Sequence, residues 1–170
     1  MRCPRSRSEC TVLTEPPMIH PSTPQRYVTG QPALSVPVDA ELSDWHLCSS
    51  WSDAVTPIPI AGDTYPSTAH LWGSTGVIEQ SAYLIAAGVV TEGPVYVASP
   101  ARALADMLYA VLAAQLDPSF LDADRTAMSP ASHQQLVTLI RMLRECEPSA
   151  ALQRWIDRQP RLVHALAASR

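Results

Sequence analysis

The sequence contains no lysine, and this absence excludes one large class of nucleotide-binding proteins. All 12 basic residues of the 170 are arginine. A Walker-type phosphate loop needs a lysine inside its motif, so the segment from Gly73 to Gly76 is not such a loop. Its backbone N–H groups would hold an anion if a helix followed the segment. The alternative is a plain turn in which Thr75 caps that helix.

Cysteine is scarce, and its spacing shows no pairing. Cys3, Cys10, Cys48 and Cys146 form no C-x-x-C pair, which is typical of a reducing compartment and of a chain without a disulfide framework. Cys48 and Cys146 have apolar neighbours, so we expect both thiols to be buried. No apolar run is long enough to span a membrane, and the N-terminus has no apolar segment of a secretion signal. We therefore expect a cytoplasmic protein that has no membrane partner.

Aromatic residues are also few, with one phenylalanine and four tryptophans. Hydrophobic residues still make up 46% of the chain, against 16% charged residues. We therefore expect a core built mostly from Ala, Leu, Val and Ile. Residues 1–32 differ, because prolines interrupt them repeatedly and no apolar period is present. We expect residues 1–32 to form a disordered leader rich in Pro and Arg, and residues 33–170 to form a single domain.

The net charge of −4 is unevenly distributed along the chain. Residues 33–128 carry two arginines and eleven acidic residues, whereas residues 129–170 carry six arginines and three acidic residues. The acidic middle does not suit a groove for nucleic acid. The basic end would suit phosphate or an acidic protein, and a solvated helical face is the alternative.

A serine followed by a proline marks the beginning of a helix in the middle of the chain. Ser99 is a good N-cap and Pro100 suits the first helical position, which predicts a helix that runs to about Leu116. Arg102 and Asp106 lie four residues apart on the side of this helix away from its apolar stripe. An exposed ion pair between them would contribute roughly 0.3–0.5 kcal/mol.

Similar signals predict three further helices, which begin at Ser129-Pro130, at Pro148 and at Pro160. In the first of them Arg141 and Arg144 are expected to face outward. The apolar positions of all four helices that we expect to face inward are Leu104, Met107, Leu108, Val111, Leu112, Leu136, Leu139, Ile140, Leu143, Leu152, Trp155, Ile156, Leu162, Val163 and Leu166.

The part of the chain before these helices favours short strands. The expected segments are strands at 33–38 and 54–60, a helix or turn at 39–51, a turn at 61–63, an extended segment at 64–73, a helix or alternatively a hairpin at 75–88, and a hairpin of 89–91 with 95–98. Together the elements predict an α+β fold. In this fold a small strand-rich N-terminal half, with a mixed or antiparallel sheet, packs against a helical C-terminal half.

No residue pattern predicts a metal site, a cofactor or a catalytic set. His46, Cys48 and His70 lack the paired spacing of zinc ligands. Ser74, His70 and Asp63 could be assembled into a Ser-His-Asp set, but any serine-rich chain permits such a selection. We therefore expect a protein that is not an enzyme and that holds no metal and no cofactor.

Two further features have a binding interpretation and a structural one. Asp122 and Asp124, beside Arg125, would bind a cation weakly, or they would form a solvated acidic turn that caps a helix. Trp51 and Trp72 would be exposed anchors for a partner, or they would pack in the core.

The helix that begins after Ser129 supports an alternative function in nucleic-acid recognition. Gln134 and Gln135 near its start could read bases, and Arg141 and Arg144 could contact phosphates. Residues 117–128 look like a loop, so no helix precedes it at the short turn of a helix-turn-helix. A DNA-binding transcriptional regulator that uses residues 129–144 is therefore the alternative to a protein-binding domain.

The segment "VYVASPARALADMLY", Val95–Tyr109, resembles a segment in the antitoxins of type IV abortive-infection (AbiE-type) toxin–antitoxin systems, which act in bacterial phage defence. There a short strand leads to Ser/Thr-Pro and then to a helix with the pattern Arg-x-Leu-x-Asp, here Arg102, Leu104 and Asp106. The resemblance implies a C-terminal antitoxin domain, not an enzyme, that docks on a nucleotidyltransferase-like toxin. The family's winged helix-turn-helix has no counterpart in the proline-rich leader, which makes DNA autoregulation doubtful.

Together these observations predict a cytoplasmic domain that is not an enzyme and that docks on or neutralises a partner protein. Under the alternative interpretation above, the partner is DNA. The candidate partner-binding residues are Arg102, Asp106, Arg141, Arg144 and Arg154. For Arg102 and Asp106 a local ion pair is the competing interpretation.

Overall fold

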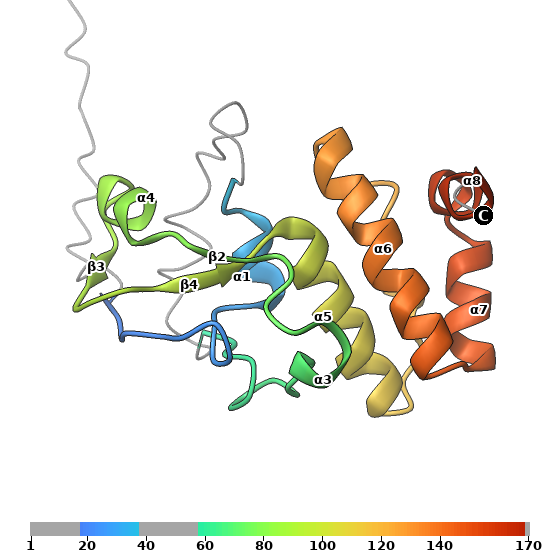
Figure 1. Ribbon diagram of the computed structural model, residues 1–170, viewed down its shortest axis with the longest axis horizontal. Helices are drawn as coiled ribbons and strands as arrows, with labels where there is room; N and C mark the ends of the chain where they lie inside the picture. The colour runs from blue at the N-terminus through green and yellow to red at the C-terminus, as the bar shows by residue number, and fades with distance from the viewer. Residues whose placement is uncertain (1–17, 38–57, 169–170) are drawn as a thin grey trace, which may run out of the picture.

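The structure is a computed structural model that describes residues 18–37 and 58–168. Short strands and small helices form one end of an elongated molecule, and the longer helices form the other end (Figure 1). The fold thus combines helices with a small set of strands, which confirms that the predicted fold contains both kinds of element. Among the described residues, no helix is both long enough and apolar enough to cross a membrane.

Two small sheets organise the first end. Strand β2 (Val77–Glu79) pairs antiparallel with β4 (Tyr96–Ala98), and β1 (Met18–Ile19) pairs parallel with β3 (Val90–Thr91). Three short helices belong to the same part of the chain: α1 (Gly30–Leu34), α3 (Ala69–Trp72) and α4 (Ser81–Ala86).

The other end consists of longer helices, the first two of which are connected by residues 114–129, and the later ones by short loops. Their bounds are α5 (Pro100–Ala113), the 3-10 turn η1 (Pro118–Phe120), α6 (Pro130–Cys146), α7 (Ala150–Asp157) and α8 (Pro160–Ala168). The predicted serine caps of α5 and α6 are confirmed, because the side chains of Ser99 and Ser129 accept hydrogen bonds from backbone N–H groups in the first turn. Ser149 caps α7 in the same way, so this helix begins two residues after Pro148.

Helix α5 lies between the two parts of the core. Ala103 packs with the buried residues of the strand-bearing end, which include Val28 and Val97. Leu104 and Leu108 pack with the buried residues of α6, α7 and α8. In Figure 1, α6 lies between α5 and the pair formed by α7 and α8. Because α5 has core on more than one side, its buried surface extends well beyond the single apolar stripe predicted for it.

Most inward-facing positions predicted for the helices are confirmed. Those buried are Leu104, Leu108, Leu136, Leu139, Ile140, Leu143, Leu152, Trp155, Ile156, Leu162 and Leu166. The prediction is wrong for Val163, whose side chain is exposed. It is also wrong for the thiol of Cys146, which is exposed at the end of α6.

Residues 18–32 belong to the fold, although the sequence predicts that they are part of a disordered leader. The side chains of Tyr27 and Val28 are fully buried. The N–H of Val28 donates to Tyr96 O at 2.9 Å, and Val28 O accepts from the N–H of Ala98 at 2.8 Å. Apart from the two-residue strand β1, isolated backbone bridges and single buried side chains hold the segment in place. Such contacts produce no apolar periodicity that the sequence could show. The rest of the predicted leader, residues 1–17, lies outside the described residues.

Several predictions for the first half are wrong. Residues 30–34 form helix α1 where a strand is predicted from 33, and α3 replaces part of the extended segment predicted at 64–73. The predicted helix at 75–88 divides into β2 and α4. The predicted hairpin of 89–98 does not form, because β3 and β4 pair with different partners. Strands of two or three residues are too short to show an alternating pattern.

Other predictions for this half are confirmed or lie outside the described residues. The turn after Ala61 is present: Gly62 N donates to Tyr65 O at 2.9 Å. Of the strand predicted at 54–60, the described part contributes the bridge between Ile60 and Val28. The helix or turn predicted at 39–51, which includes Trp51, lies outside the described residues.

The position of Val28 in the core can be tested by truncating its side chain. We expect Val28→Ala to lower the free energy of unfolding by about 1.5–3 kcal/mol, because it removes buried methyl groups. Gln31→Ala, an exposed position in the adjacent α1, should change it by less than about 0.5 kcal/mol. Urea unfolding followed by circular dichroism measures both. Equal, small effects would mean that residues 18–32 do not contribute to the core.

Candidate functional site

The charged residues of the Arg-x-Leu-x-Asp pattern form a buried ion pair. Arg102 Nε lies 3.0 Å from Asp106 Oδ1, and both side chains are 0% exposed. The predicted pairing is therefore confirmed, whereas its predicted exposure is wrong. The reason is the position of α5, since strand-end residues cover the side of this helix that would otherwise face water.

The carboxylate of Asp106 accepts three hydroxyl hydrogen bonds in addition to the bond from Arg102. Tyr27 Oη and Thr29 Oγ1 donate to Oδ2 at 2.9 and 2.7 Å, and Thr68 Oγ1 donates to Oδ1 at 2.6 Å. Burial, and secondarily the charge of Asp106, raises the pKa of the Tyr27 phenol well above its usual value. The phenol therefore remains a donor to the carboxylate. We call Tyr27, Thr29, Thr68, Arg102 and Asp106 the Arg102–Asp106 centre.

The guanidinium of Arg102 is satisfied by a second group of acceptors. Nη1 donates to Thr75 O at 2.7 Å and to Gly73 O at 3.3 Å, and Nη2 donates to Thr68 Oγ1 at 2.9 Å. The guanidinium carbon also lies 5.0 Å from the ring centroid of Trp72 and 5.2 Å from that of Tyr27, which are cation–π distances. The buried charge thus has partners around it, as burial requires.

The loop from Gly73 to Gly76 holds a cation and does not cradle an anion. The carbonyls of Gly73 and Thr75 accept from Arg102, while the N–H groups of Thr75 and Val77 donate to Trp72 O and Ser74 O. This arrangement does not favour the anion-binding interpretation of the loop. The helix that either interpretation of this loop assumes is absent as well, because strand β2 follows.

Gly76 allows this loop to approach α5 closely. Its φ is +75°, and a Cβ added there would lie 2.9 Å from Arg102 Cβ and 3.0 Å from Ser99 Oγ. A larger residue would push the loop away from the guanidinium that its carbonyls bind. The glycine is thus needed both for its backbone conformation and for its lack of a side chain.

The Arg102–Asp106 centre is structural in character. All five side chains are at most 1% exposed, so no substrate or partner contacts them directly. The centre instead connects three segments, around residues 27–29, 68–75 and 102–106, into one unit. For Arg102 and Asp106 the geometry therefore corresponds to the local ion pair and leaves no exposed surface for a partner contact.

The other candidate residues lie on different parts of the helical end. Arg141 and Arg144 are partly buried on α6, and Arg154 is exposed on α7. Gln134 is exposed, but the amide oxygen of Gln135 accepts a hydrogen bond from Ser99 Oγ at 2.6 Å. The structure thus joins Gln135 to the beginning of α5 and does not gather these residues at one site.

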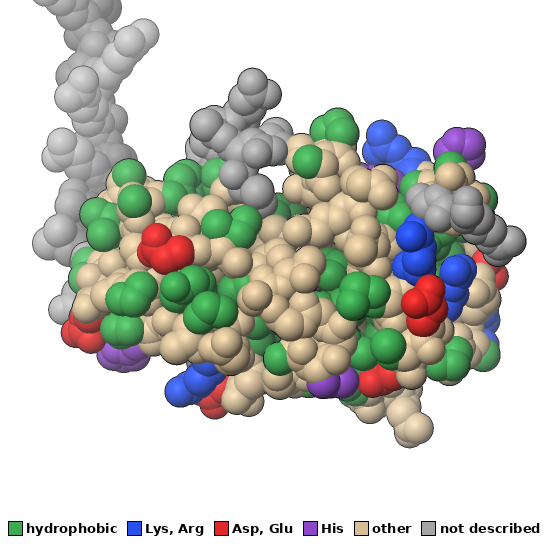
Figure 2. All heavy atoms as spheres, viewed as in Figure 1, with side chains coloured by type: hydrophobic (Ala, Val, Ile, Leu, Met, Phe, Trp, Pro, Cys, Tyr) green, Lys and Arg blue, Asp and Glu red, His purple; other side chains and the backbone are tan. Residues whose placement is uncertain are grey.

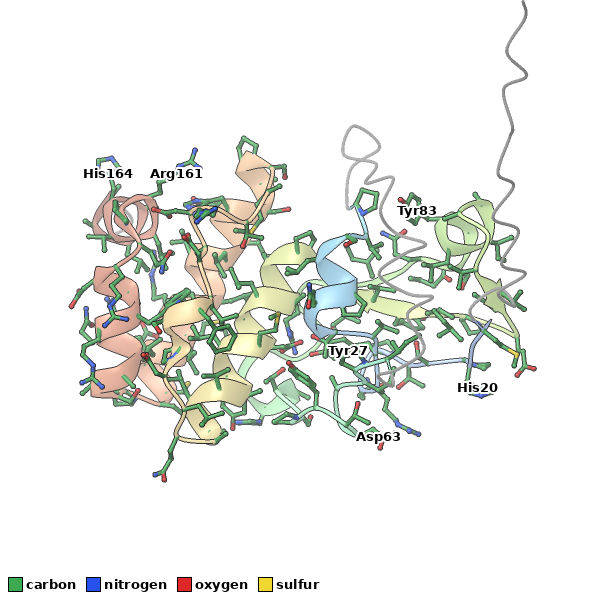
Figure 3. All side chains as sticks on the ribbon, turned by 180° about the vertical axis from the view of Figure 1, so that it is seen from behind. His20, Tyr27, Asp63, Tyr83, Arg161 and His164 are labelled. Carbon is green, nitrogen blue, oxygen red and sulfur yellow. The ribbon has the colours of Figure 1, made fainter. Side chains whose placement is uncertain are left out.

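The candidate catalytic set is not assembled. His70 Nε2 lies 3.4 Å from Glu147 Oε1, and its ring meets the edge of Tyr109. Asp63 instead pairs with Arg26 at the surface, and Figure 3 shows Asp63 at the edge of the molecule. His70 and Asp63 therefore each have a partner outside the predicted set.

The acidic turn and the tryptophans also have defined roles. Asp122 Oδ1 accepts from Arg125 N at 2.9 Å, a bond within the turn itself. Asp124 Oδ2 accepts from Arg161 N at 3.1 Å in the first turn of α8, so Asp124 is the one of the two that bonds to the beginning of a helix. Trp72 is buried and donates from Nε1 to Leu139 O at 3.0 Å, so it is a core residue. Within residues 18–37 and 58–168 no group of His, Cys, Asp and Glu could hold a metal ion; His46, Cys48 and Trp51 lie outside these ranges.

A groove that the sequence does not predict lies between the C-terminal end of α5 and α7. Its volume is about 510 Å³. We call it the α5–α7 groove; its lining residues are Leu112, Gln115, Leu116, Asp117, Pro118, Ser149, Ala151, Arg154, Trp155 and Arg158. Of the residues singled out from the sequence as partner-binding, Arg154 belongs to it. The signal that could have found it is the predicted end of the helix at Leu116, next to Asp117-Pro118.

The dependence of the fold on the buried carboxylate can be tested by one isosteric change made at two sites. We expect Asp106→Asn to lower the free energy of unfolding by about 3–5 kcal/mol, because it leaves the buried charge of Arg102 uncompensated. Asp63→Asn breaks a surface pair whose side chains are 49% and 63% exposed, and it should cost less than about 1 kcal/mol. Urea unfolding gives both values. Similar costs at the two sites would contradict the structural role of the centre.

The close approach at Gly76 can be tested in the same assay. We expect Gly76→Ala to be more destabilising than Gly88→Ala. Both glycines have positive φ, +75° and +86°, so both substitutions carry a backbone cost of roughly 1–2 kcal/mol. At Gly88 no atom lies within 4 Å of an added Cβ, so the difference between the variants measures the contact with α5. No difference would show that the loop can move away from Arg102 freely.

Comparisons with known proteins add no relative to this description. No protein-family model matches the chain, and neither a curated protein nor a solved structure matches it. The resemblance to AbiE-type antitoxins therefore stays a prediction that these comparisons leave untested.

Proposed function

We propose that this chain is a non-enzymatic protein-binding domain that docks on a partner protein and neutralises it, in the manner of the toxin-binding domain of AbiE-type antitoxins. The observation that carries the proposal is the form of Val95–Tyr109. Strand β4 leads to the capping Ser99, to Pro100 at the first helical position and to a helix that carries the Arg-x-Leu-x-Asp pattern. This is the order of elements that the resemblance implies.

The use of the pattern residues supports a binding role over a catalytic one. The side chains of Arg102 and Asp106 make several hydrogen bonds each, and both are buried. They position residues 27–29, the segment from Thr68 to the Gly73–Gly76 loop, and α5 relative to one another. A rigid inner frame of this kind leaves the outer faces of the helices as the surface on which a partner would dock.

The outer surface of the last helices has the composition of a contact surface for an acidic partner. Arg154, Arg158, Arg161 and His164 are exposed there. Figure 2 shows basic side chains at the end of the molecule that α7 and α8 form. Arg161 and His164 point away from α8 in Figure 3. Positive charge on a surface favours encounter with a negatively charged partner.

The alternative, a DNA-binding regulator that uses residues 129–144, has less support. Helix α6 packs against α5, α3 and α8, so it is an interior layer of the helical end. The side chain of Gln135 is held by Ser99, and it would have to leave this bond to contact a base. A recognition helix instead presents its beginning to the major groove of DNA.

The proposal is tested by isolating the tagged full chain from its native host and identifying the proteins that accompany it by mass spectrometry. We expect a stoichiometric partner protein that remains bound after nuclease treatment and that forms a complex again when both proteins are purified separately. We also expect the partner to inhibit growth when it is produced alone, and growth to return when this chain is produced with it.

Either of two results would overturn the proposal. One is the recovery of nuclease-sensitive material alone, with binding to DNA that weakens steeply as salt rises; this result would favour the regulator. The other is a purified partner whose activity is unchanged in the stoichiometric complex.

A further inference from the structure

The α5–α7 groove is open to solvent, and its lining combines apolar with polar side chains. Trp155 is 1% exposed and contributes a buried floor. Leu112 and Ala151 are partly buried beside it, and Leu116 is 61% exposed at the edge. Phe120, 66% exposed, lies in η1 two residues after the lining residue Pro118. Large exposed apolar side chains beside a hollow are a common feature of protein contact sites.

The backbone at the end of α5 presents Leu116 in this way. Gln115 has a φ of +57°, a left-handed conformation that costs a residue with a side chain roughly 1–2 kcal/mol. Leu116 N donates to Val111 O at 3.0 Å and Gln115 N to Leu112 O at 2.9 Å, which close the helix. An apolar residue after such a helix end usually packs back onto the helix. Here the side chain of Leu116 remains exposed at the edge of the groove, so its apolar surface is available for contact with a partner side chain.

Positive charge lines the mouth of the groove. Arg154 and Arg158 lie four residues apart on the exposed side of α7, and both line the groove. Asp117 is the acidic residue among the lining residues, so two positive charges stand against one negative charge there. Hydrogen bonds from Ser119 chiefly, and the charges of Arg158 and Arg154 to a smaller extent, lower the pKa of Asp117.

A second hollow extends the groove across α5. It has a volume of about 210 Å³ and shares Leu112 and Ser149 with the groove. Its other lining residues are Tyr109, Ala113, Leu143, Glu147 and Pro148. Glu147 is a second acidic residue of the extended site, and its Oε1 lies 3.4 Å from His70 Nε2, so the excess of positive charge belongs to the α5–α7 groove alone. The two hollows together form an elongated site, which suits a peptide segment better than a compact small molecule.

We propose that the α5–α7 groove binds an acidic amphipathic segment of the partner protein. Its apolar side chains would enter between Leu112, Leu116 and Trp155, and its carboxylates would pair with Arg154 and Arg158. This inference rests on the proposed protein-binding function and names the chemistry of the partner. A nucleic-acid strand would satisfy the two arginines through its phosphates, but it would leave the exposed side chain of Leu116 without an apolar partner.

The test uses the full chain and two fluorescein-labelled helical peptides, measured by fluorescence anisotropy. Both peptides carry leucine on one helical face; the other positions are glutamate in the acidic probe and lysine in the basic probe. We expect the wild-type chain to bind the acidic probe at least about tenfold more tightly, because two ion pairs form at the rim of an apolar site. The double variant Arg154→Glu with Arg158→Glu should reverse this preference.

Two further variants separate the groove from general charge effects. Leu116→Ser should weaken binding of the preferred probe to both the wild-type and the charge-reversed chain. Arg125→Glu reverses an exposed arginine in the turn before α6 that does not line the groove, and it should leave the preference unchanged. Thermal unfolding verifies that each variant is folded. Equal binding of the two probes, or an Arg125→Glu effect as large as that of the double variant, would overturn the inference.

The outcomes also distinguish this inference from the proposed function. A partner isolated from the native host that binds wild-type chain and the Arg154→Glu, Arg158→Glu variant equally would overturn the groove as its docking site and leave the proposed function intact. Absence of any protein partner, together with equal binding of the two probes, would overturn both.

Discussion

The buried ion pair between Arg102 and Asp106 is the constraint on which the rest of the structure depends. Two charges removed from water are tolerated only when their hydrogen-bonding groups are satisfied. The hydroxyls of Tyr27, Thr29 and Thr68 satisfy the hydrogen-bonding capacity of the carboxylate. Carbonyls of the Gly73–Gly76 loop do the same for the guanidinium. Because these partners come from segments far apart in the sequence, the pair determines how the strand-bearing end meets the helices.

The same constraint separates the inner and outer roles of the chain. The polar residues of the pattern hold α5 between the two parts of the core, and Gly76 lets the loop reach it. The surface beyond α5 is then formed by α7, α8 and the exposed end of α5, where arginines and apolar side chains border the α5–α7 groove. A binding function therefore requires no change in the frame, since the groove is open in the described structure.

Local signals predict the helical end well, and they fail where tertiary contacts decide the structure. The caps at Ser99 and Ser129 depend on bonds within one turn, which the sequence carries directly. The spacing of Arg102 and Asp106 predicts their pairing but not their burial, because burial depends on the strand end that covers α5. Residues 18–32 and the two-residue strands have no periodicity to read. The α5–α7 groove arises from the packing of two helices; the predicted helix end at Leu116, beside Asp117-Pro118, marks one edge of it, and no local signal marks the edge that α7 forms.

The most direct test of the central role of the carboxylate is a double-mutant cycle of Thr29→Val and Thr68→Val, measured by urea unfolding. The two residues lie 39 positions apart, and both donate to Asp106, one to each oxygen. Since a carboxylate that has lost one donor depends more on those that remain, the double variant should lose more stability than the sum of the single variants, by about 0.5–1.5 kcal/mol. Additive effects would show that the two hydroxyls act independently, and they would contradict the account of Asp106 as the common anchor of these segments.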